Sequence, residues 1–581
     1  MNAIEYPAYS EPRGLAEGTL WSFGRNGERP PENRSPEVGP LLLEPGEGRG
    51  EEPSIAQPIP RAHAAGCSCK MNPEARAPNE DPPRHNRIQK ADGVTVAEKY
   101  LARLCEKSFL SLWSYPGVYR DQGKPQNGGH GKEICDLLVF FDQHVIIFSD
   151  KHCQLQDSGD VGRDWQRWFK KAIQKSAEQA WGAERWIRQN PNRVFLDREC
   201  KCHLPIDLPE MGKAIFHLVV VAHGVSSRIR NCFVGGSGSL MLNTGLKGFD
   251  THTFPFYVGD LAPQKTFVHV LDDDSLHTLM STRDTISDFA AYLSKREKLL
   301  RGQRAICATG EEELLAIYLK NFTEDNEHDF VFPIGPGQVV DKIYLPEGHW
   351  EDFHNSPERI AQLNEDRVSY AWDKLIEKFN YYAMRGEQHF VTGGGIKDTE
   401  RVLRFMAREP RWKRRYLAKC LLEMIHTTLP TQRSLRVLLP TDVGDPHYVF
   451  LLLPTVHAKT DEEYRLVRRR FLEDCCAVAK LEYPDAKDIV GIATEAGTNR
   501  ASRSEDAIYV DAREWSAQME SNARMLQKEL GILTEPVRVE ERMQEYPDMP
   551  VGEARMKNPR NKPCPCGSGK KYKHCCLNKQ R

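Results

Sequence analysis

Four cysteines near the end of the 581-residue chain impose the strongest local constraint in the sequence. They are spaced as C-x-C-x8-C-C, at Cys564, Cys566, Cys575 and Cys576. Zinc takes four tetrahedral ligands of this soft kind, and the loop between the two pairs is long enough to bring them together. Within each pair, the cysteines are too close in sequence for an unstrained disulfide. The spacing therefore predicts a zinc site, with His574 as an alternative to one cysteine.

The segment around these cysteines, residues 563–576, resembles the SEC-C motif, the small zinc-binding tail also found at the C-terminus of the SecA translocation ATPase. The resemblance implies a docking module without a catalytic role. Four protein ligands leave no open coordination position, which independently favours a structural metal. From Ala554 to Arg581 there are nine lysine or arginine residues and no acidic residue. This basic tail suits an acidic partner, either nucleic acid or a protein surface.

Composition divides the rest of the chain. Residues 1–92 are rich in proline, glycine and charge, and such a segment cannot bury enough apolar surface to fold, so we expect disorder there. We expect an α/β domain over 93–300 and a poorly patterned linker over 301–348. A second α/β domain of unknown role is expected over 349–545, followed by a linker and the zinc motif over 546–581.

Hydrophobic periodicity predicts the elements of both α/β domains. The helices expected are 95–113, 165–189, 281–300, 357–385, 397–428, 461–480 and 515–530. The strands expected are 134–141, 144–149, 213–223, 253–258, 266–271, 435–439, 448–453, 489–494 and 507–510.

Charged residues lie at the open end of the hairpin that is expected in the first domain, where its first strand begins and its second strand ends. Glu133 and Asp136 open its first strand, and Asp150 and Lys151 close its second. Phosphodiester cleavage uses carboxylates that bind Mg²⁺ beside a lysine that orients the attacking water. These four residues are therefore the candidate catalytic residues, with Mg²⁺ as the cofactor.

This region, about residues 93–190, resembles the PD-(D/E)xK nuclease superfamily and, more loosely, its Mrr-like branch. The resemblance implies a restriction-endonuclease-like mixed sheet in which a helix before the hairpin carries a further acid. Glu98 and Glu106 are the candidates for that acid. The resemblance also implies a glutamine from the helix after the hairpin, here Gln174 or Gln179.

The sequence departs from that superfamily at one position. Residues two apart in a strand share a face, so D/E-x-K places acid and lysine together. Here Ser149 stands two residues before Lys151, and Asp150 points to the opposite face of a regular strand. Three alternatives follow. A β-bulge re-aims Asp150, Glu133 supplies the missing carboxylate, or Asp150 and His152 form a site on the opposite face.

Two functions agree with these features. The chain is either a metal-dependent nuclease-like protein that acts on nucleic acid, or a non-enzymatic adaptor whose degenerate nuclease fold and zinc tail recruit a protein or ribosomal partner. A formal charge of -2 and 40% hydrophobic residues are typical of a soluble globular protein. Sixteen scattered cysteines fit the reducing cytoplasm. No apolar run reaches the length of a membrane span, so we expect no membrane partner.

Overall fold

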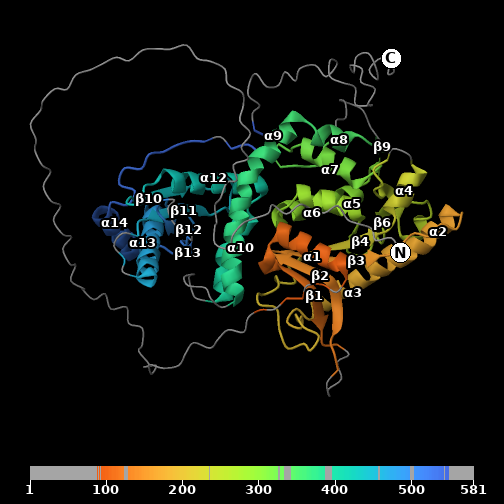
Figure 1. The fold of residues 1–581 in the computed structure, drawn as a ribbon, viewed down its shortest axis with the longest axis horizontal. Helices are drawn as coiled ribbons and strands as arrows, with labels where there is room; N and C mark the ends of the chain where they lie inside the picture. The colour runs from red at the N-terminus through yellow and green to blue at the C-terminus, as the bar shows by residue number, and fades with distance from the viewer. Residues whose placement is uncertain are drawn as a thin grey trace, which may run out of the picture. The chain divides into compact units, whose positions relative to one another are not determined.

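The computed structural model describes residues 88–547 except for residues 89, 92, 94, 123–128, 234–235, 325–326, 333–341, 386–394, 456–457, 459, 498–502 and 542. The segment expected to be disordered, 1–92, lies almost wholly outside the described residues. The predicted zinc ligands lie outside them entirely. The described part is a mixed α/β structure with three sheets (Figure 1).

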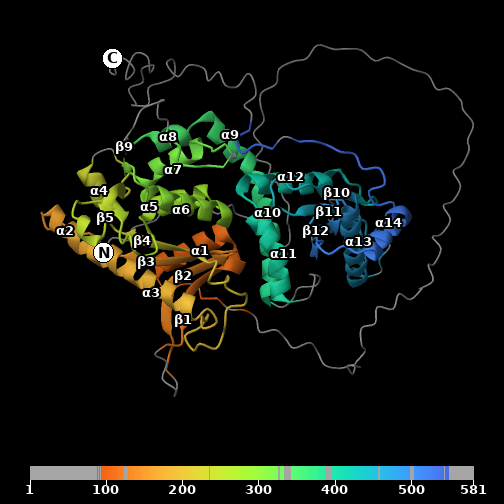
Figure 2. The same cartoon turned by 180° about the vertical axis from the view of Figure 1, so that it is seen from behind.

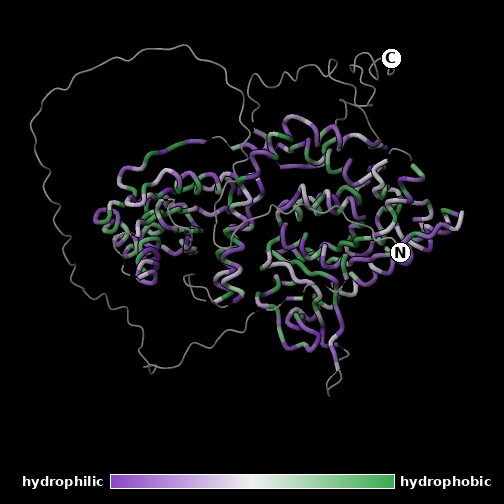
Figure 3. Tube along the Cα trace, viewed as in Figure 1, coloured by the Kyte–Doolittle hydropathy of each residue, from purple (hydrophilic) through white to green (hydrophobic). Residues whose placement is uncertain are grey.

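A five-stranded mixed sheet carries the candidate catalytic residues. Its strands are β1 (Ser114–Arg120), β2 (Lys132–Phe141), β3 (His144–His152), β4 (Ile215–His223) and β7 (Val268–Leu271), which lie side by side in this order. The first three strands are antiparallel, whereas β3, β4 and β7 are parallel. Residues of these strands are largely hydrophobic, as Figure 3 shows, because the sheet is covered on both faces.

The hairpin expected between residues 134 and 149 is confirmed as β2 and β3. Its turn contains Asp142 with a φ of 49°, a conformation that aspartate tolerates better than most residues. The neighbouring strand β1 was not expected from the sequence. Pro116 and Gly117 interrupt its apolar pattern, and both residues weaken a strand assignment made from sequence.

Helices pack against both faces of this sheet. The helix expected before the hairpin is α1 (Val96–Phe109), and the long helix after it is α2 (Val161–Trp168), a π-helical turn over 169–174 and α3 (Lys175–Gln189). Phe109 of α1 stacks on Phe148 with ring centroids 6.4 Å apart, and Arg188 of α3 lies 4.0 Å from the ring centroid of Phe216. Strand alternation puts Phe148 and Phe216 on opposite faces. Both views place α1 beside β2 and β3 (Figures 1 and 2).

A second sheet corrects the expectation of a linker over 301–348. Its order is β6 (Tyr257–Asp260), β5 (Met241–Lys247), β8 (Ala305–Ala308) and β9 (Lys342–Leu345). Two of these strands, together with α7 (Glu311–Lys320), fall within the segment expected to be unstructured. β8 and β9 have only four residues each, and so short a strand gives almost no periodic signal.

The remaining described residues contain a third sheet and its helices. The sheet has the order β10 (Ser434–Leu438), β11 (His447–Leu453), β12 (Asp488–Glu495) and β13 (Glu505–Asp511). All four strands were expected from the sequence. The helices that accompany this sheet are α10 (Tyr370–Arg385), α11 (Ile396–Arg408), α12 (Arg411–Thr427), α13 (Asp461–Glu482) and α14 (Ala517–Leu530). The other described helices, which pack elsewhere in the structure, are α4 (Ser226–Cys232), α5 (Asp273–Thr282), α6 (Ile286–Leu300), α8 (His349–His354) and α9 (Pro357–Glu365).

Two helices expected from the sequence are each divided in the structure. The segment 357–385 consists of α9 and α10 with a 3-10 turn over 366–369 between them. The segment 397–428 divides into α11 and α12 at Pro410, which cannot donate the hydrogen bond that a continuous helix requires. Among the described helices, none combines the length and the apolar character needed to cross a bilayer.

Candidate functional site

The end of the hairpin places Asp136 and Lys151 on one face of the first sheet. Leu137 of β2 lies opposite Phe148 of β3, and one further step of the same register puts Asp136 opposite Ser149. Opposed residues share a face, and so do residues two apart in a strand. Asp136, Ser149 and Lys151 are therefore on one face, whereas Asp150 is on the other.

Strand β3 is regular at Asp150, so the bulge alternative is not what the structure shows. Its pairing with β4 runs without a register shift from His144 opposite Ile215 to His152 opposite His223. The carboxylate of Asp150 consequently meets His223, with Oδ1 2.5 Å from Nε2. The structure therefore does not bring the Asp150 carboxylate to Lys151 as the superfamily pattern requires.

His223 lies between two carboxylates on this opposite face. Its Nε2 contacts Asp150, and its Nδ1 contacts Asp273 at the start of α5. Burial lowers the pKa of His223, but the hydrogen bonds to Asp150 and Asp273 outweigh burial and raise it to about 10. The His152 ring centroid is 5.8 Å from that of His223. This arrangement is an ion triad, with Asp150 buried and Asp273 partly exposed, that joins the end of β3 to β4 and α5.

Asp136 is linked to β3 through the backbone. Its Oδ2 accepts a hydrogen bond of 2.6 Å from the N–H of Asp150. Burial raises the pKa of Asp136 to about 7; the Asp150 N–H acts in the opposite direction, and the charges of Glu133, Asp150 and Glu98 add to the rise. Two acidic side chains, Glu98 of α1 and Glu133 of β2, thus add to the rise in the pKa of Asp136.

Glu98, and not Glu106, is the helix acid that the structure brings towards Asp136. Glu98 lies in the first turn of α1, where it forms a capping box with Thr95. Its charge raises the pKa values of both Asp136 and Glu133, although burial is the larger cause for each. Glu106 lies in the last turn of the same helix and acts on the pKa of Lys90 instead.

The other residues implied by the superfamily resemblance have different surroundings. Lys151 is half-buried and forms no hydrogen bond or ion pair with any other residue that the structure describes. Its ammonium group is therefore available to a ligand. Gln174 donates a hydrogen bond of 3.0 Å to Glu178 along the helix surface, and Gln179 is exposed. Neither glutamine is bonded to Asp136.

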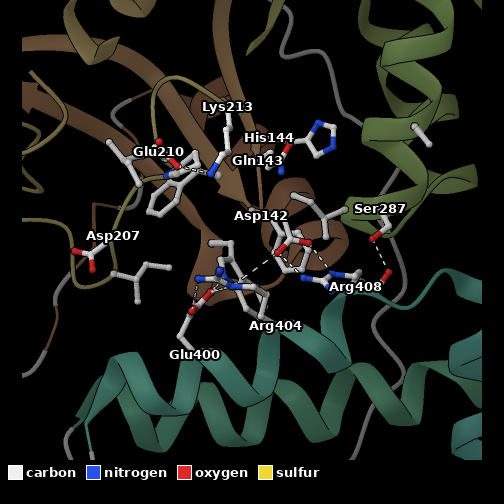
Figure 4. Close-up of a pocket in the computed structure, with 18 of the residues that line it drawn as sticks. Asp142, Gln143, His144, Asp207, Glu210, Lys213, Ser287, Glu400, Arg404 and Arg408 are labelled. Atoms are coloured by element: carbon white, nitrogen blue, oxygen red, sulfur yellow. Dashed lines mark hydrogen bonds and ion pairs between the residues drawn. The ribbon is translucent and has the colours of Figure 1, made fainter. Parts of the chain in front are cut away.

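The opposite end of the hairpin opens into a pocket with a volume of about 890 Å³ (Figure 4). Figure 4 shows Asp142, Arg404 and Arg408 turned towards one another inside it. Arg408 binds both carboxylate oxygens of Asp142 at 2.8 Å, and Arg404 is paired with Glu400 at 2.6 Å. Because these charges neutralise one another within the protein, the pocket is a weaker candidate for chemistry than the Asp136 end.

Sequence reasoning did not find His223 and Asp273. They are 50 positions apart, and their contact depends on the parallel placement of β4 beside β3. Each residue nevertheless has one sequence feature that weakly indicates a functional position. His223 ends a buried apolar strand, and Asp273 lies within a run of three aspartates.

Comparisons with known proteins bear on the C-terminal segment. Residues 560–578 match the family model of the SEC-C motif, and they include all four cysteines and His574. The chain is also 43% identical over 61 residues to the protein translocase subunit SecA of a Nitratiruptor species. That match covers 10% of this chain and 7% of the SecA chain. No solved structure gives a significant match. The resemblance to the SEC-C motif is thereby confirmed.

The His223 triad predicts a specific pH dependence of stability. The folded-state pKa of about 10 lies above the ordinary histidine value, so the stabilisation is complete below about pH 6.5 and is lost as the pH rises through 10. We expect His223→Gln to lower the free energy of unfolding by about 1.5–3 kcal/mol at pH 6. This difference between parent and variant should shrink towards pH 10.

Urea unfolding of the parent and of His223→Gln at pH 6, 8 and 10 measures this difference. The matched control is His426→Gln, because His426 is an exposed histidine. A difference between the parent and His223→Gln that is equal at pH 6 and pH 10 would contradict a charged His223.

Proposed function

We propose that this chain is a metal-dependent nuclease-like protein that acts on nucleic acid, and that its SEC-C segment is a zinc-binding docking module. The observation that supports the catalytic part best is the environment of Asp136. This half-buried carboxylate is oriented by the backbone of β3, has Glu98 and Glu133 nearby, and shares its face with Lys151. The helix before the hairpin and the mixed sheet agree with a restriction-endonuclease-like fold.

The donor set around Asp136 fits Mg²⁺ in kind. Mg²⁺ prefers carboxylate oxygens, is held by one or two of them and keeps several of its waters. Asp136 would hold the ion directly, and Glu133 and Glu98 would contact it through water. Bound Mg²⁺ supplies a Lewis acid for the phosphate and lowers the pKa of a bound water.

The protein residues have separate roles in this proposal. Lys151 binds the phosphate or the attacking water, since its ammonium group is not engaged by another described residue. Asp150 is a positioning residue: its N–H orients Asp136, and its carboxylate is held by His223. Of the three alternatives left by the sequence, the structure thus favours Glu133 as the additional carboxylate.

A non-enzymatic adaptor remains the second proposal because of one observation. Ser149 occupies the position at which the superfamily has its second acid, and Asp150 is turned to the opposite face. In that case the nuclease-like fold binds nucleic acid without cleaving it, and the basic zinc-binding tail recruits an acidic protein or ribosomal partner. Both proposals place the chain in the cytoplasm, in agreement with ten free cysteines among the described residues.

Cleavage assays on circular DNA, linear DNA and RNA with Mg²⁺ or Mn²⁺ distinguish the two proposals. We expect Asp136→Asn and Lys151→Ala to lower the cleavage rate at least about 100-fold, the effect of removing a group that stabilises the transition state. Glu133→Gln should be comparably damaging. Asp150→Asn should retain most activity per folded molecule, because its N–H remains.

The matched control for these variants is Glu210→Gln, which changes an exposed glutamate in the same domain. Circular dichroism checks that each variant is folded. Absence of metal-dependent cleavage by the parent, or parental rates in Asp136→Asn and Lys151→Ala, would leave the adaptor proposal.

The docking module predicts one zinc ion per chain. Elemental analysis of the purified chain should find this ion, and the double variant Cys564→Ser/Cys566→Ser should lose it, because two of the four ligands are removed. Cys202→Ser is the control, since Cys202 is an exposed cysteine outside the motif. Equal zinc contents in the parent and the double variant would contradict the assigned ligands.

A further inference from the structure

Helix α7 begins with three consecutive glutamates, and two of them, Glu311 and Glu313, accept hydrogen bonds from other residues. Glu311 forms a buried ion pair with Arg296, in which Nε and Oε1 are 2.7 Å apart. Glu313 accepts hydrogen bonds of 3.1 Å from the N–H groups of Gly348 and Trp350 at the start of α8. These contacts fix the N-terminus of α7 and orient it towards the loop before α8.

The glutamate between them, Glu312, is buried without such a partner. Its relative exposure is 7%, and neither carboxylate oxygen accepts a hydrogen bond of good geometry from the described part of the chain. The nearby hydroxyls of Ser237 and Ser239 lower the pKa of Glu312, but burial outweighs them and raises it to about 7. Burying an unpaired carboxylate is costly, and in native proteins such groups are paired or coordinate a metal.

A third carboxylate completes the group. Glu347, in the loop between β9 and α8, is exposed and accepts a hydrogen bond of 3.1 Å from the N–H of Ser237. One oxygen each from Glu312, Glu313 and Glu347 lies within 4.8 Å of the other two. No lysine, arginine or histidine among the described residues forms an ion pair with these glutamates.

The carboxylate of Glu312 is closely packed against the backbone on one side of the three-glutamate group. A Cβ atom added to Gly310 would lie 2.3 Å from Oε1 of Glu312, so the carboxylate rests directly against the backbone at the start of α7. Figures 1 and 2 both show α7 and α8 next to each other, with β9 leading into α8. The three oxygens thus come from α7 and from the loop that connects β9 to α8.

We propose that Glu312, Glu313 and Glu347 bind a divalent cation of the oxygen-preferring class, with Ca²⁺ as the best-fitting ion. Carboxylate oxygens without nitrogen or sulfur ligands favour Ca²⁺, Mg²⁺ or Mn²⁺ over zinc. Ca²⁺–oxygen bonds of about 2.3–2.6 Å place ligands on opposite sides of the ion about 4.6–5.2 Å apart. The oxygens of this group already lie within that span. The ion would supply the partner that Glu312 lacks and would join α7 to the loop before α8.

This site is separate from the proposed catalytic site, so the two are tested independently. Calorimetric titration of the full-length, zinc-loaded chain with Ca²⁺ in metal-depleted buffer should show binding. Saturating Ca²⁺, at about 100 times the dissociation constant, should raise the melting temperature by about 2–4 °C. Asp136→Asn should bind this Ca²⁺ as the parent does.

Two variants change the ligands without enlarging or emptying the site. Glu347→Gln, at an exposed position, should weaken Ca²⁺ binding at least 10-fold and abolish the rise in melting temperature. Glu312→Gln should abolish binding and also raise the melting temperature in Ca²⁺-free buffer, because an unpaired buried charge is removed. Glu210→Gln is the matched control and should behave as the parent.

A parent whose melting temperature does not respond to Ca²⁺, Mn²⁺ or Mg²⁺ would overturn the proposal. Parental Ca²⁺ affinity in both Glu312→Gln and Glu347→Gln would overturn it equally. Stabilisation by Glu312→Gln, together with a parent that binds no Ca²⁺, would show that Glu312 is an unpaired buried carboxylate without a ligand, and would overturn the proposal.

Discussion

The candidate site depends on one hydrogen bond, the 2.6 Å bond from the N–H of Asp150 to the carboxylate of Asp136. A carboxylate at the start of a buried strand is costly unless it is satisfied, and here the neighbouring strand supplies the donor. The same residue, Asp150, sends its own carboxylate to the opposite face, where His223 binds it. One position of β3 thus serves both faces of the sheet: its backbone N–H binds Asp136 on one face, and its side chain binds His223 on the other.

Most buried charges elsewhere in the described structure follow the rule that a charge is buried with its partner. Arg411 binds Asp284 and Asp373 at 2.8 and 2.7 Å, and Arg468 binds Asp506 at 2.6 Å. Removing one partner of such a pair leaves an uncompensated charge, which is strongly destabilising. Asp136 and Glu312 lack such a partner: burial raises the pKa of each to about 7, and no cationic side chain of the described residues forms an ion pair with either. Glu409 shares these two properties and is bound by the hydroxyl of Tyr448 at 2.9 Å. Carboxylates with raised pKa values are candidates for ligand sites, and the surroundings of Asp136 and Glu312 distinguish them from Glu409 because further acidic side chains lie beside each.

The sequence predicted the hairpin well because two apolar runs and a two-residue turn are a strong local signal. Alternation along β3 predicted that a regular strand separates Asp150 from Lys151, but the sequence left a bulge open as an alternative; the regular pairing of β3 with β4 decides between the two. The zinc motif was recognised because the spacing of its cysteines can be read from the sequence without any knowledge of the fold. By contrast, β1 was missed because Pro116 and Gly117 break its pattern, and β8 and β9 because they are too short. The contacts of His223 and Glu312 arise from distant segments that only the folded chain brings together.

The nuclease proposal requires the half-buried carboxylate of Asp136, at the start of β2, to be a metal ligand, and diffraction tests this requirement most directly. Crystals of the full chain with Mn²⁺ and a short oligonucleotide, measured at the manganese absorption edge, locate every bound Mn²⁺ ion. We predict an anomalous peak about 2–2.3 Å from a carboxylate oxygen of Asp136, with Lys151 facing the adjacent phosphate. Ordered oligonucleotide without a manganese peak at Asp136 would contradict the proposal.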